Sequence, residues 1–130
     1  MNFIKVKETC LYVHDLEAIR KYYHEVLELP IINYDPGKHI FFRLGSSVLL
    51  CFNPEDSRYK LSPPGHFGGG KQHVAFEVSA LDYAGTKALM ISKGIKLIEE
   101  VTWKSGAESF YFEDPEGNIL EILPDKGIWD

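Results

Sequence analysis

Three residues that lie far apart in the sequence, Glu8, His73 and Glu121, are of types that bind metal ions or transfer protons. One neutral imidazole and two carboxylates suit a borderline-to-hard divalent ion such as Mn, Fe, Co, Ni or Zn. Three protein ligands would leave coordination positions for water and substrate, which a catalytic metal site needs. Glu121 or Glu8 could alternatively act as a general base beside a polarised carbonyl group, in which case that carboxylate would have to leave the ion.

A repeat in the sequence relates two of these residues. Residues 8–13 followed by Leu16 resemble residues 73–78 followed by Leu81, at a constant offset of 65 (73 − 8 and 81 − 16). Each copy has the pattern of an alternating strand that enters an amphipathic helix. We therefore expect two copies of one supersecondary unit, with a carboxylate and an imidazole at its first position.

The elements that would position these residues follow the same order in both halves. In the first half we expect a helix after Asp15 and strands near 4–13, 31–34, 39–44 and 48–52. In the second half we expect a helix that ends at Gly94 and strands near 73–78, 96–101, 109–113 and 118–123. The predicted fold is α+β, with two βαβββ modules forming a partly open, eight-stranded, barrel-like sheet around one cavity. We expect a single domain over 1–130, with module one at about 4–53, a Pro-, Gly- and Ser-rich linker at about 54–71, and module two at about 72–124.

Alternation along the predicted strands assigns side chains to a helix-covered face or to a concave face. Glu8, His73 and Glu121 all fall on the concave face, and we predict that they are metal ligands. When residues 118–123 are aligned with residues 47–52, Glu121 falls at the position of Leu50, which therefore blocks a fourth ligand position. We expect the substrate pocket to be lined by Tyr12, Cys10, Phe41, Arg43, Leu50, Tyr111 and Trp103.

The composition disfavours several classes of protein. With 130 residues, 45% hydrophobic and 25% charged, the chain has the balance of one globular domain. A formal net charge of −5 without a basic patch disfavours nucleic-acid binding. No segment has the apolar length of a signal peptide or a membrane span. Both cysteines, Cys10 and Cys51, fall in predicted strands, so we expect reduced thiols and a cytoplasmic protein without a membrane partner.

Several motifs together resemble the vicinal oxygen chelate superfamily, which includes glyoxalase I, bleomycin-resistance proteins, fosfomycin-resistance enzymes and extradiol dioxygenases. The motifs cover nearly the whole chain, at residues 13–18, 22–23, 26–30, 72–78 and 110–122. The resemblance implies a homodimer and metal-ligand positions at Glu8, Leu50, His73 and Glu121. His73 and Glu121 match the family pattern. In contrast, the first-strand ligand is usually His or sometimes Gln, and glyoxalase-like members carry Glu in place of Leu50.

The resemblance and the candidate ligands favour a metal-dependent lyase, isomerase or transferase of glyoxalase type, acting on a small substrate with vicinal oxygens. One divalent ion would chelate adjacent substrate oxygens and stabilise an enolate or oxyanion. The alternative is a metal-free small-molecule-binding or drug-sequestering protein of the bleomycin-resistance type, which Leu50 and Glu8 favour. An extradiol dioxygenase comes third, because such enzymes are usually longer and no acid–base histidine is evident near the predicted cavity.

Overall fold

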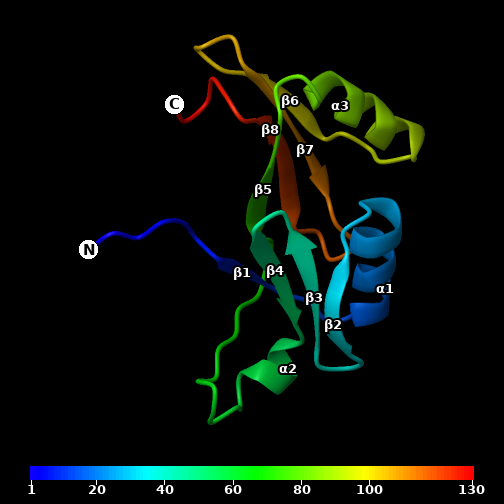
Figure 1. Cartoon of the computed structure of the whole chain (residues 1–130). Helices are drawn as coiled ribbons and strands as arrows, with labels where there is room; N and C mark the ends of the chain where they lie inside the picture. Colours follow the sequence, from blue (N-terminus) through cyan, green and yellow to red (C-terminus); the bar gives the residue numbers. More distant parts are fainter. The chain divides into compact units, whose positions relative to one another are not determined.

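Each half of the chain forms its own four-stranded sheet, in which the opening strand lies beside the closing strand (Figure 1). The computed structural model describes residues 1–130, and these divide into two units, Met1–Gly70 and Lys71–Asp130. Both sheets are open and are accompanied by few helices, which confirms the predicted α+β class.

Unit 1 contains four strands in the order β1-β4-β3-β2. They are β1 (Glu8–Tyr12), β2 (Ile31–Asp35), β3 (His39–Leu44) and β4 (Ser47–Phe52), and only the β1–β4 pair is parallel. The helix after β1 begins as α1 (Leu16–Arg20), where Asp15 Oδ1 accepts a hydrogen bond from the Ala18 N–H at 3.0 Å. This is the predicted N-cap.

Two helical features of unit 1 differ from the sequence prediction. The helix that starts as α1 continues as a π-helix, η1 (Lys21–Val26), instead of an ordinary α-helix. Its backbone hydrogen bonds span five residues, as from the Leu27 N–H to the Tyr22 carbonyl at 2.9 Å. A short helix, α2 (Pro54–Ser57), occupies part of the segment expected to be a linker, and the Asn53 side chain accepts a hydrogen bond from the Glu55 N–H at its start. Residues 58–72 contain no further helix or strand.

Unit 2 repeats this topology with the strand order β5-β8-β7-β6. Its elements are β5 (His73–Val78), α3 (Tyr83–Ser92), β6 (Glu99–Thr102), β7 (Glu108–Glu113) and β8 (Ile119–Pro124), and again only the pair of opening and closing strands is parallel. Gly94 lies just after α3 with a φ of +85°, a conformation that favours glycine at a helix end. Gly117 has a φ of +81° in the turn between β7 and β8, a conformation that glycine adopts without steric cost.

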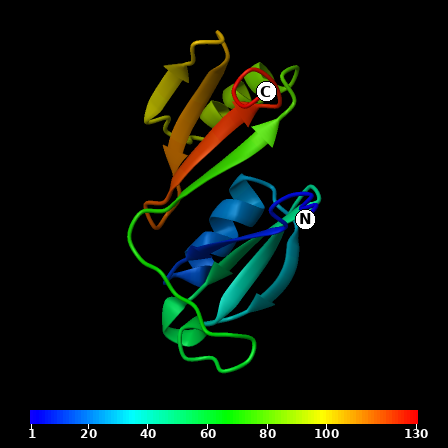
Figure 2. The same ribbon diagram turned by 90° about the vertical axis from the view of Figure 1, so that its left-hand side faces the viewer.

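In each unit the helix covers one face of the sheet, and the hydrophobic core lies between them (Figure 2). Along β3 and β4, buried side chains alternate with half-buried or exposed ones, as one covered face requires. In β8, however, Leu120, Glu121 and Ile122 are all buried, so both faces of that strand are covered. Burial of each large apolar side chain contributes roughly 1.5–3 kcal/mol. The core of unit 1 includes Leu11, Val13, Ile19, Tyr23, Ile40, Phe42, Leu49 and Cys51, and that of unit 2 includes Phe76, Met90, Phe110, Phe112, Leu120 and Ile122.

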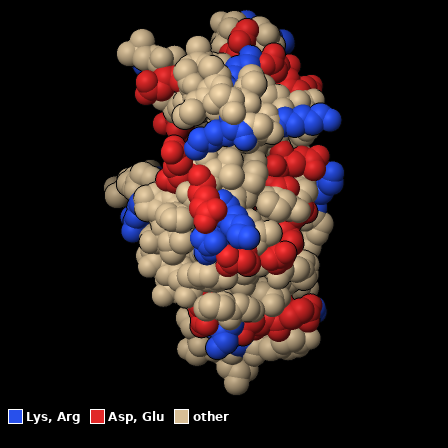
Figure 3. All heavy atoms as spheres, turned by 90° about the vertical axis from the view of Figure 1, so that its right-hand side faces the viewer, with Lys and Arg blue, Asp and Glu red and all other residues tan.

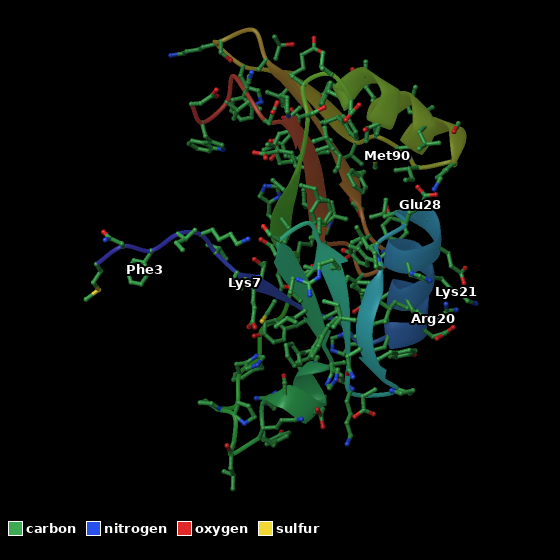
Figure 4. All side chains as sticks on the ribbon, in the orientation of Figure 1. Phe3, Lys7, Arg20, Lys21, Glu28 and Met90 are labelled. Atoms are coloured by element: carbon green, nitrogen blue, oxygen red, sulfur yellow. The ribbon has the colours of Figure 1, made fainter.

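The surface carries charges of both signs. On the face drawn in Figure 3, Lys and Arg side chains are interspersed with Asp and Glu side chains. Figure 4 shows Arg20 and Lys21 on the side of the first helix that points away from the sheet. Arg20 lies 2.7 Å from a carboxylate oxygen of Glu17 and 3.1 Å from one of Glu25, and such exposed pairs stabilise a fold only slightly.

The N-terminal residues 1–7 precede β1 without regular structure and extend away from its sheet (Figure 4). Their apolar side chains, including Phe3, Ile4 and Val6, are exposed. The amines of Lys5 and Lys7 both donate to the carbonyl oxygen of Ser46, which ties the end of this segment to the turn before β4. None of the helices in the structure combines the length and the apolar character that crossing a membrane would require.

Candidate metal centre

The face of the unit 2 sheet opposite α3 carries two of the predicted ligands. In the parallel β5–β8 pair, His73 lies opposite Ile119 and Ala75 lies opposite Glu121, so these four side chains share one face. His73 and Glu121 are diagonal neighbours, and His73 Nε2 lies 3.3 Å from Glu121 Oε1. The side chain of His73 is 51% exposed, whereas that of Glu121 is only 7% exposed. A carboxylate buried to this degree requires partners that offset its loss of hydration.

The hydrogen position on His73 is set by a backbone contact on the other side of its ring. His73 Nδ1 lies 2.9 Å from the carbonyl oxygen of Ile119. A carbonyl oxygen only accepts hydrogen bonds, so Nδ1 carries the hydrogen and a neutral imidazole keeps its lone pair on Nε2. That lone pair faces Glu121 Oε1, which is also an acceptor when the carboxylate is ionised. A cation between the two atoms, either a proton on Nε2 or a metal ion, makes this arrangement favourable.

The donor atoms and their spacing fit a divalent metal ion. Imidazole nitrogen and carboxylate oxygen bind such ions at about 2.0–2.2 Å, so two ligand atoms on one ion lie roughly 3–3.5 Å apart. The 3.3 Å between His73 Nε2 and Glu121 Oε1 falls within this range. A hydrogen bond from Nδ1 to a carbonyl oxygen is also a common way in which proteins orient a metal-binding histidine. Within each unit, no three side chains of His, Cys, Asp or Glu are grouped to hold a metal ion.

Tyr111 and Trp103, two of the predicted pocket residues, belong to the same face of unit 2. Tyr111 lies directly opposite Glu121 in the β7–β8 pair, and its ring centroid is 6.0 Å from that of His73. Burial is the largest effect that raises the pKa of the Tyr111 phenol, and a hydrogen bond to Glu121 raises it further, whereas a hydrogen bond with Ser109 lowers it. The Trp103 indole N–H donates to Ser109 Oγ at 3.0 Å. Ser109 is fully buried, and the sequence pattern alone gave no signal for it.

A buried turn holds β8 in register with β5. The carboxylate of Asp114 accepts hydrogen bonds from the backbone N–H groups of Glu116 and Asn118 and, at 2.8 Å, from the Asn118 amide. Asn118 Oδ1 in turn accepts a hydrogen bond from the Gln72 N–H at 3.1 Å. Asn118 is 1% exposed, so these bonds are not replaced by water. The turn therefore fixes the residue before His73 against the residue that precedes β8.

The corresponding face of unit 1 carries Glu8, which lies opposite Val48 in the parallel β1–β4 pair. Leu50 lies opposite Cys10, just as Glu121 lies opposite Ala75 in unit 2, so the sheet registers make Leu50 and Glu121 equivalent. Burial and then the charge of Glu8 raise the pKa of the Cys10 thiol, which therefore stays protonated at neutral pH. The role of Glu8 as a metal ligand stays a prediction.

The rest of this unit 1 face is largely aromatic. The rings of His39 and Phe41 are stacked with centroids 4.3 Å apart, and Phe52 contacts both, at 5.9 Å and 5.4 Å. Phe41 lies opposite Leu50, and Arg43 lies opposite Val48, on the same face. We call the half-buried rings of His39, Phe41 and Phe52 the aromatic wall.

His66, a loop residue that no strand or helix pattern singles out, extends this surface from the loop after α2. Its Nδ1 lies 2.7 Å from the hydroxyl of Tyr12, and its ring centroid is 4.7 Å from that of Phe52. A loop residue without periodicity carries no signal of such a contact in the sequence. Burial and then the neighbouring Cys10 raise the pKa of Tyr12, so its hydroxyl stays protonated beside His66.

Comparison with known proteins identifies the family. The model of the Glyoxalase/Bleomycin resistance protein/Dioxygenase superfamily matches residues 5–122. The chain therefore belongs to this superfamily, in agreement with the resemblance seen in the sequence. Among curated proteins, no significant match is found.

Solved structures show the same fold over nearly the whole chain. A lactoylglutathione lyase from Agrobacterium tumefaciens is 29% identical, with a TM-score of 0.88 and coverage of 93% of both chains. A glyoxalase/bleomycin resistance protein/dioxygenase from Nocardioides is 20% identical, with a TM-score of 0.75 and coverage of 100% of this chain and 90% of that one. A glyoxalase/dioxygenase from Nostoc punctiforme is 23% identical, with a TM-score of 0.67 and coverage of 94% and 91%. At 20% and 23% identity, the last two structures show a shared fold and no more.

Proposed function

We propose that this chain is a divalent-metal-dependent enzyme of glyoxalase type, a lyase, isomerase or transferase acting on a small substrate with vicinal oxygens. The observation that carries the proposal is the pair of facing acceptor atoms, His73 Nε2 and Glu121 Oε1, at 3.3 Å. The likeness to a lactoylglutathione lyase favours a lyase among the three reaction types. Its named compound contains a hydroxyl group next to a thioester carbonyl, which is the arrangement of adjacent oxygens that we propose for the substrate.

In this proposal, His73 and Glu121 hold the metal ion and Glu8 is its third protein ligand. Glu8 is supported by its place at the start of β1, which corresponds to the place of His73 at the start of β5. A bound divalent ion would polarise a substrate carbonyl group and stabilise the negative charge that develops on its oxygen. Two carboxylate ligands cancel the charge of the ion, so it would be a weaker Lewis acid than one held by two histidines and one glutamate.

The residues have distinct roles in the proposed reaction. His73 offers Nε2 because Ile119 retains the hydrogen of Nδ1, so its lone pair does not depend on rotation of the ring. Glu8 or Glu121 moves the proton next to the substrate carbonyl, and the one that does so has to release the ion first. Glu8 suits this role better, because its side chain is exposed whereas that of Glu121 is buried.

Calorimetric titration of the full chain with Co²⁺ or Zn²⁺ at neutral pH, after chelator has been removed, tests the proposal. We expect one ion per chain, and we expect His73→Ala and Glu121→Gln each to weaken binding more than about 100-fold, which exceeds the usual effect of a residue that only supports a ligand. Glu77→Gln is the matched control, because Glu77 lies on the same face of β5, is exposed and undergoes the same change of charge. Unchanged affinity in the His73 and Glu121 variants, or no binding by the wild type, would refute the proposal.

One observation favours the second candidate, a metal-free small-molecule-binding or drug-sequestering protein. The same face of unit 1 carries the aromatic wall and Leu50, where a glyoxalase-like metal site would need a carboxylate. Flat aromatic rings can bind apolar ligands without any chemical change. The same titration separates the two candidates, because the binding protein would take up no metal ion at any pH near neutrality. The homodimer and the cytoplasmic location also stay predictions, and the mass of the protein in solution addresses the first.

A further inference from the structure

We infer that the unit 1 face with the aromatic wall binds an aromatic carboxylate, whose ring stacks on Phe41 and whose acid group pairs with Arg43. The inference rests on the proposed function in one respect, since it narrows the small substrate of that function to an aromatic acid. The binding surface itself belongs to unit 1 and needs no metal ion. Arg43 then determines specificity for the charge of the ligand, and Phe41 determines specificity for its flat ring.

Two rings of the aromatic wall form a stack along β3. His39 and Phe41 are two residues apart on this strand and therefore share one face. Their rings are nearly parallel, with an angle of 11° between the planes and centroids 4.3 Å apart, so His39 covers one side of the Phe41 ring. Phe52 approaches Phe41 at an angle of 62° and does not extend the stack. The second side of the half-buried Phe41 ring is therefore not covered by another ring.

Arg43 is the next residue of β3 on this face, and its side chain is exposed. Of the three arginines in the chain, Arg20 is paired with two glutamates, and the guanidinium of Arg58 lies 4.1 Å from the centre of the Phe67 ring. Within unit 1, the guanidinium of Arg43 has no hydrogen bond, ion pair or ring contact. A guanidinium presents its N–H donors in a plane and binds a carboxylate through two of them. Arg43 can therefore pair with an acid group of a ligand.

The spacing along the strand fits one flat ring between Phe41 and Arg43. Side chains two residues apart on a strand are separated by about 6.4–6.8 Å. Carbon atoms in contact lie about 3.5 Å apart, so a ring between two groups separates them by about 7 Å. A ring in this position would stack on Phe41 and contact the methylene groups of Arg43, while the guanidinium reaches an acid group at the edge of the ring. An aromatic carboxylate satisfies both side chains, whereas an uncharged ring would leave Arg43 unpaired.

The charges at this end of the unit 1 sheet favour an anion. The amines of Lys5 and Lys7 lie 2.9 and 2.8 Å from the carbonyl oxygen of Ser46, in the turn that follows β3. Two ammonium groups that share one acceptor repel each other, and a nearby anion would offset that repulsion. Among the strand residues of this face, the carboxylate at this end is Glu8, which lies two strands from Arg43, roughly 10 Å away and too far for a direct pair. Three cations therefore outweigh one carboxylate here, although the whole chain has a net charge of −5.

Unit 2 provides an internal comparison, because the registers of its strands match those of unit 1. Arg43 lies opposite Val48, and Glu113 lies opposite the equivalent residue Ile119, so Glu113 holds the position of Arg43 in unit 2. Glu113 lies 3.8 Å from the amine of Lys71. This position is therefore cationic in unit 1 and anionic in unit 2. An acid group is favoured at this position in unit 1 alone.

Calorimetric titration of the metal-free full chain with 2-naphthoate tests the inference, and uncharged 2-naphthamide is the matched ligand. We expect naphthoate to bind about 10-fold more tightly than the amide, at the low end of the effect of hydrogen bonds to a charged group. Arg43→Gln should weaken naphthoate binding about 10-fold and leave amide binding unchanged. Phe41→Leu should weaken the binding of both ligands about 2–10-fold, because it removes the stacked ring. Arg20→Gln is the matched control, since Arg20 lies on the side of the first helix that points away from the sheet, and it should change neither affinity (Figure 4).

Chemical-shift changes by NMR locate the bound ligand, and we expect the largest changes at residues 41–43. Equal affinity for naphthoate and naphthamide, unchanged naphthoate affinity in Arg43→Gln, or no binding by the wild type would overturn the inference. These results would leave the proposed metal site intact, because no metal ion is present in this experiment. Failure of the wild type to bind Co²⁺ in the separate titration would overturn the proposed metal enzyme alone. Because Arg43 is exposed, Arg43→Gln decides the question even if Phe41→Leu does not fold.

Discussion

At the scale of single residues, the surroundings of two histidines give them opposite chemistry. His73 is half exposed, its Nδ1 donates to a backbone carbonyl, and its Nε2 faces a carboxylate. His39 lies 2.7 Å from Asn33 Oδ1 through Nε2, which must therefore carry the hydrogen, and its Nδ1 is buried without a hydrogen-bond partner. The first histidine is suited to bind a cation, and the second is a neutral part of the aromatic wall.

This difference predicts how His39 titrates. Burial, the largest effect, lowers the pKa of His39 below its ordinary value of 6.5, although the nearby Asp35 opposes this shift. The unfolded chain therefore takes up a proton at a higher pH than the folded chain does. The stability contributed by neutral His39 is fully present above pH 6.5 and is lost as the pH falls through the lower pKa of the folded state.

Two measurements check this prediction. Titration by NMR should give His39 a pKa below 6.5, whereas a value at or above 6.5 would contradict the burial argument. His39→Phe keeps a ring against Phe41 but cannot be protonated. We expect this variant to lose less unfolding free energy than the wild type on acidification from about pH 7 to about pH 5.

At the scale of elements, the registers of the strands create the His73–Glu121 pair. Alternation along β5 and β8 was sufficient to predict that both side chains lie on one face, because the pattern of apolar residues fixes the faces of a strand. Helix winding and strand ends were less predictable: η1 is π-helical, and β6 begins at Glu99 instead of near residue 96. These depend on tertiary packing rather than on local periodicity.

The turn before β8 should control both stability and the metal site. Asn118→Ala removes the amide that bonds Asp114 and the carbonyl that bonds the Gln72 N–H, and it leaves buried groups unsatisfied. We expect it to lower the free energy of unfolding by roughly 2–4 kcal/mol, measured by urea denaturation. Because Gln72 precedes His73, Co²⁺ affinity should fall as well.

Pro115→Ala is the control for this turn, since Pro115 is exposed and contributes no buried hydrogen bond to it. Its effect on unfolding should stay within about 1 kcal/mol, as is usual for a proline substitution in a loop. If Asn118→Ala were as stable as the control, the Asp114–Asn118 hydrogen bonds would not hold β8 in register with β5.

At the scale of the whole molecule, one duplicated topology carries two different surfaces. The sequence repeat predicts the equivalence of Leu50 and Glu121, and the strand registers agree with it. The sequence does not reveal that His73 is oriented by the Ile119 carbonyl, because this contact depends on atomic positions within the folded sheet. Unit 2 therefore carries Glu121 and Tyr111 at positions where unit 1 has Leu50 and Phe41.

The central claim is that His73 and Glu121 bind the same divalent ion, and a crystal structure of the full chain grown with Co²⁺ tests it most directly. Anomalous diffraction at the cobalt edge should show one peak about 2.0–2.2 Å from both His73 Nε2 and a carboxylate oxygen of Glu121, with Nδ1 still bonded to the Ile119 carbonyl. The same map would show whether Glu8 is the third ligand. A peak on Nδ1 or at a different site, or a direct His73–Glu121 ion pair without cobalt at saturating concentration, would contradict the account.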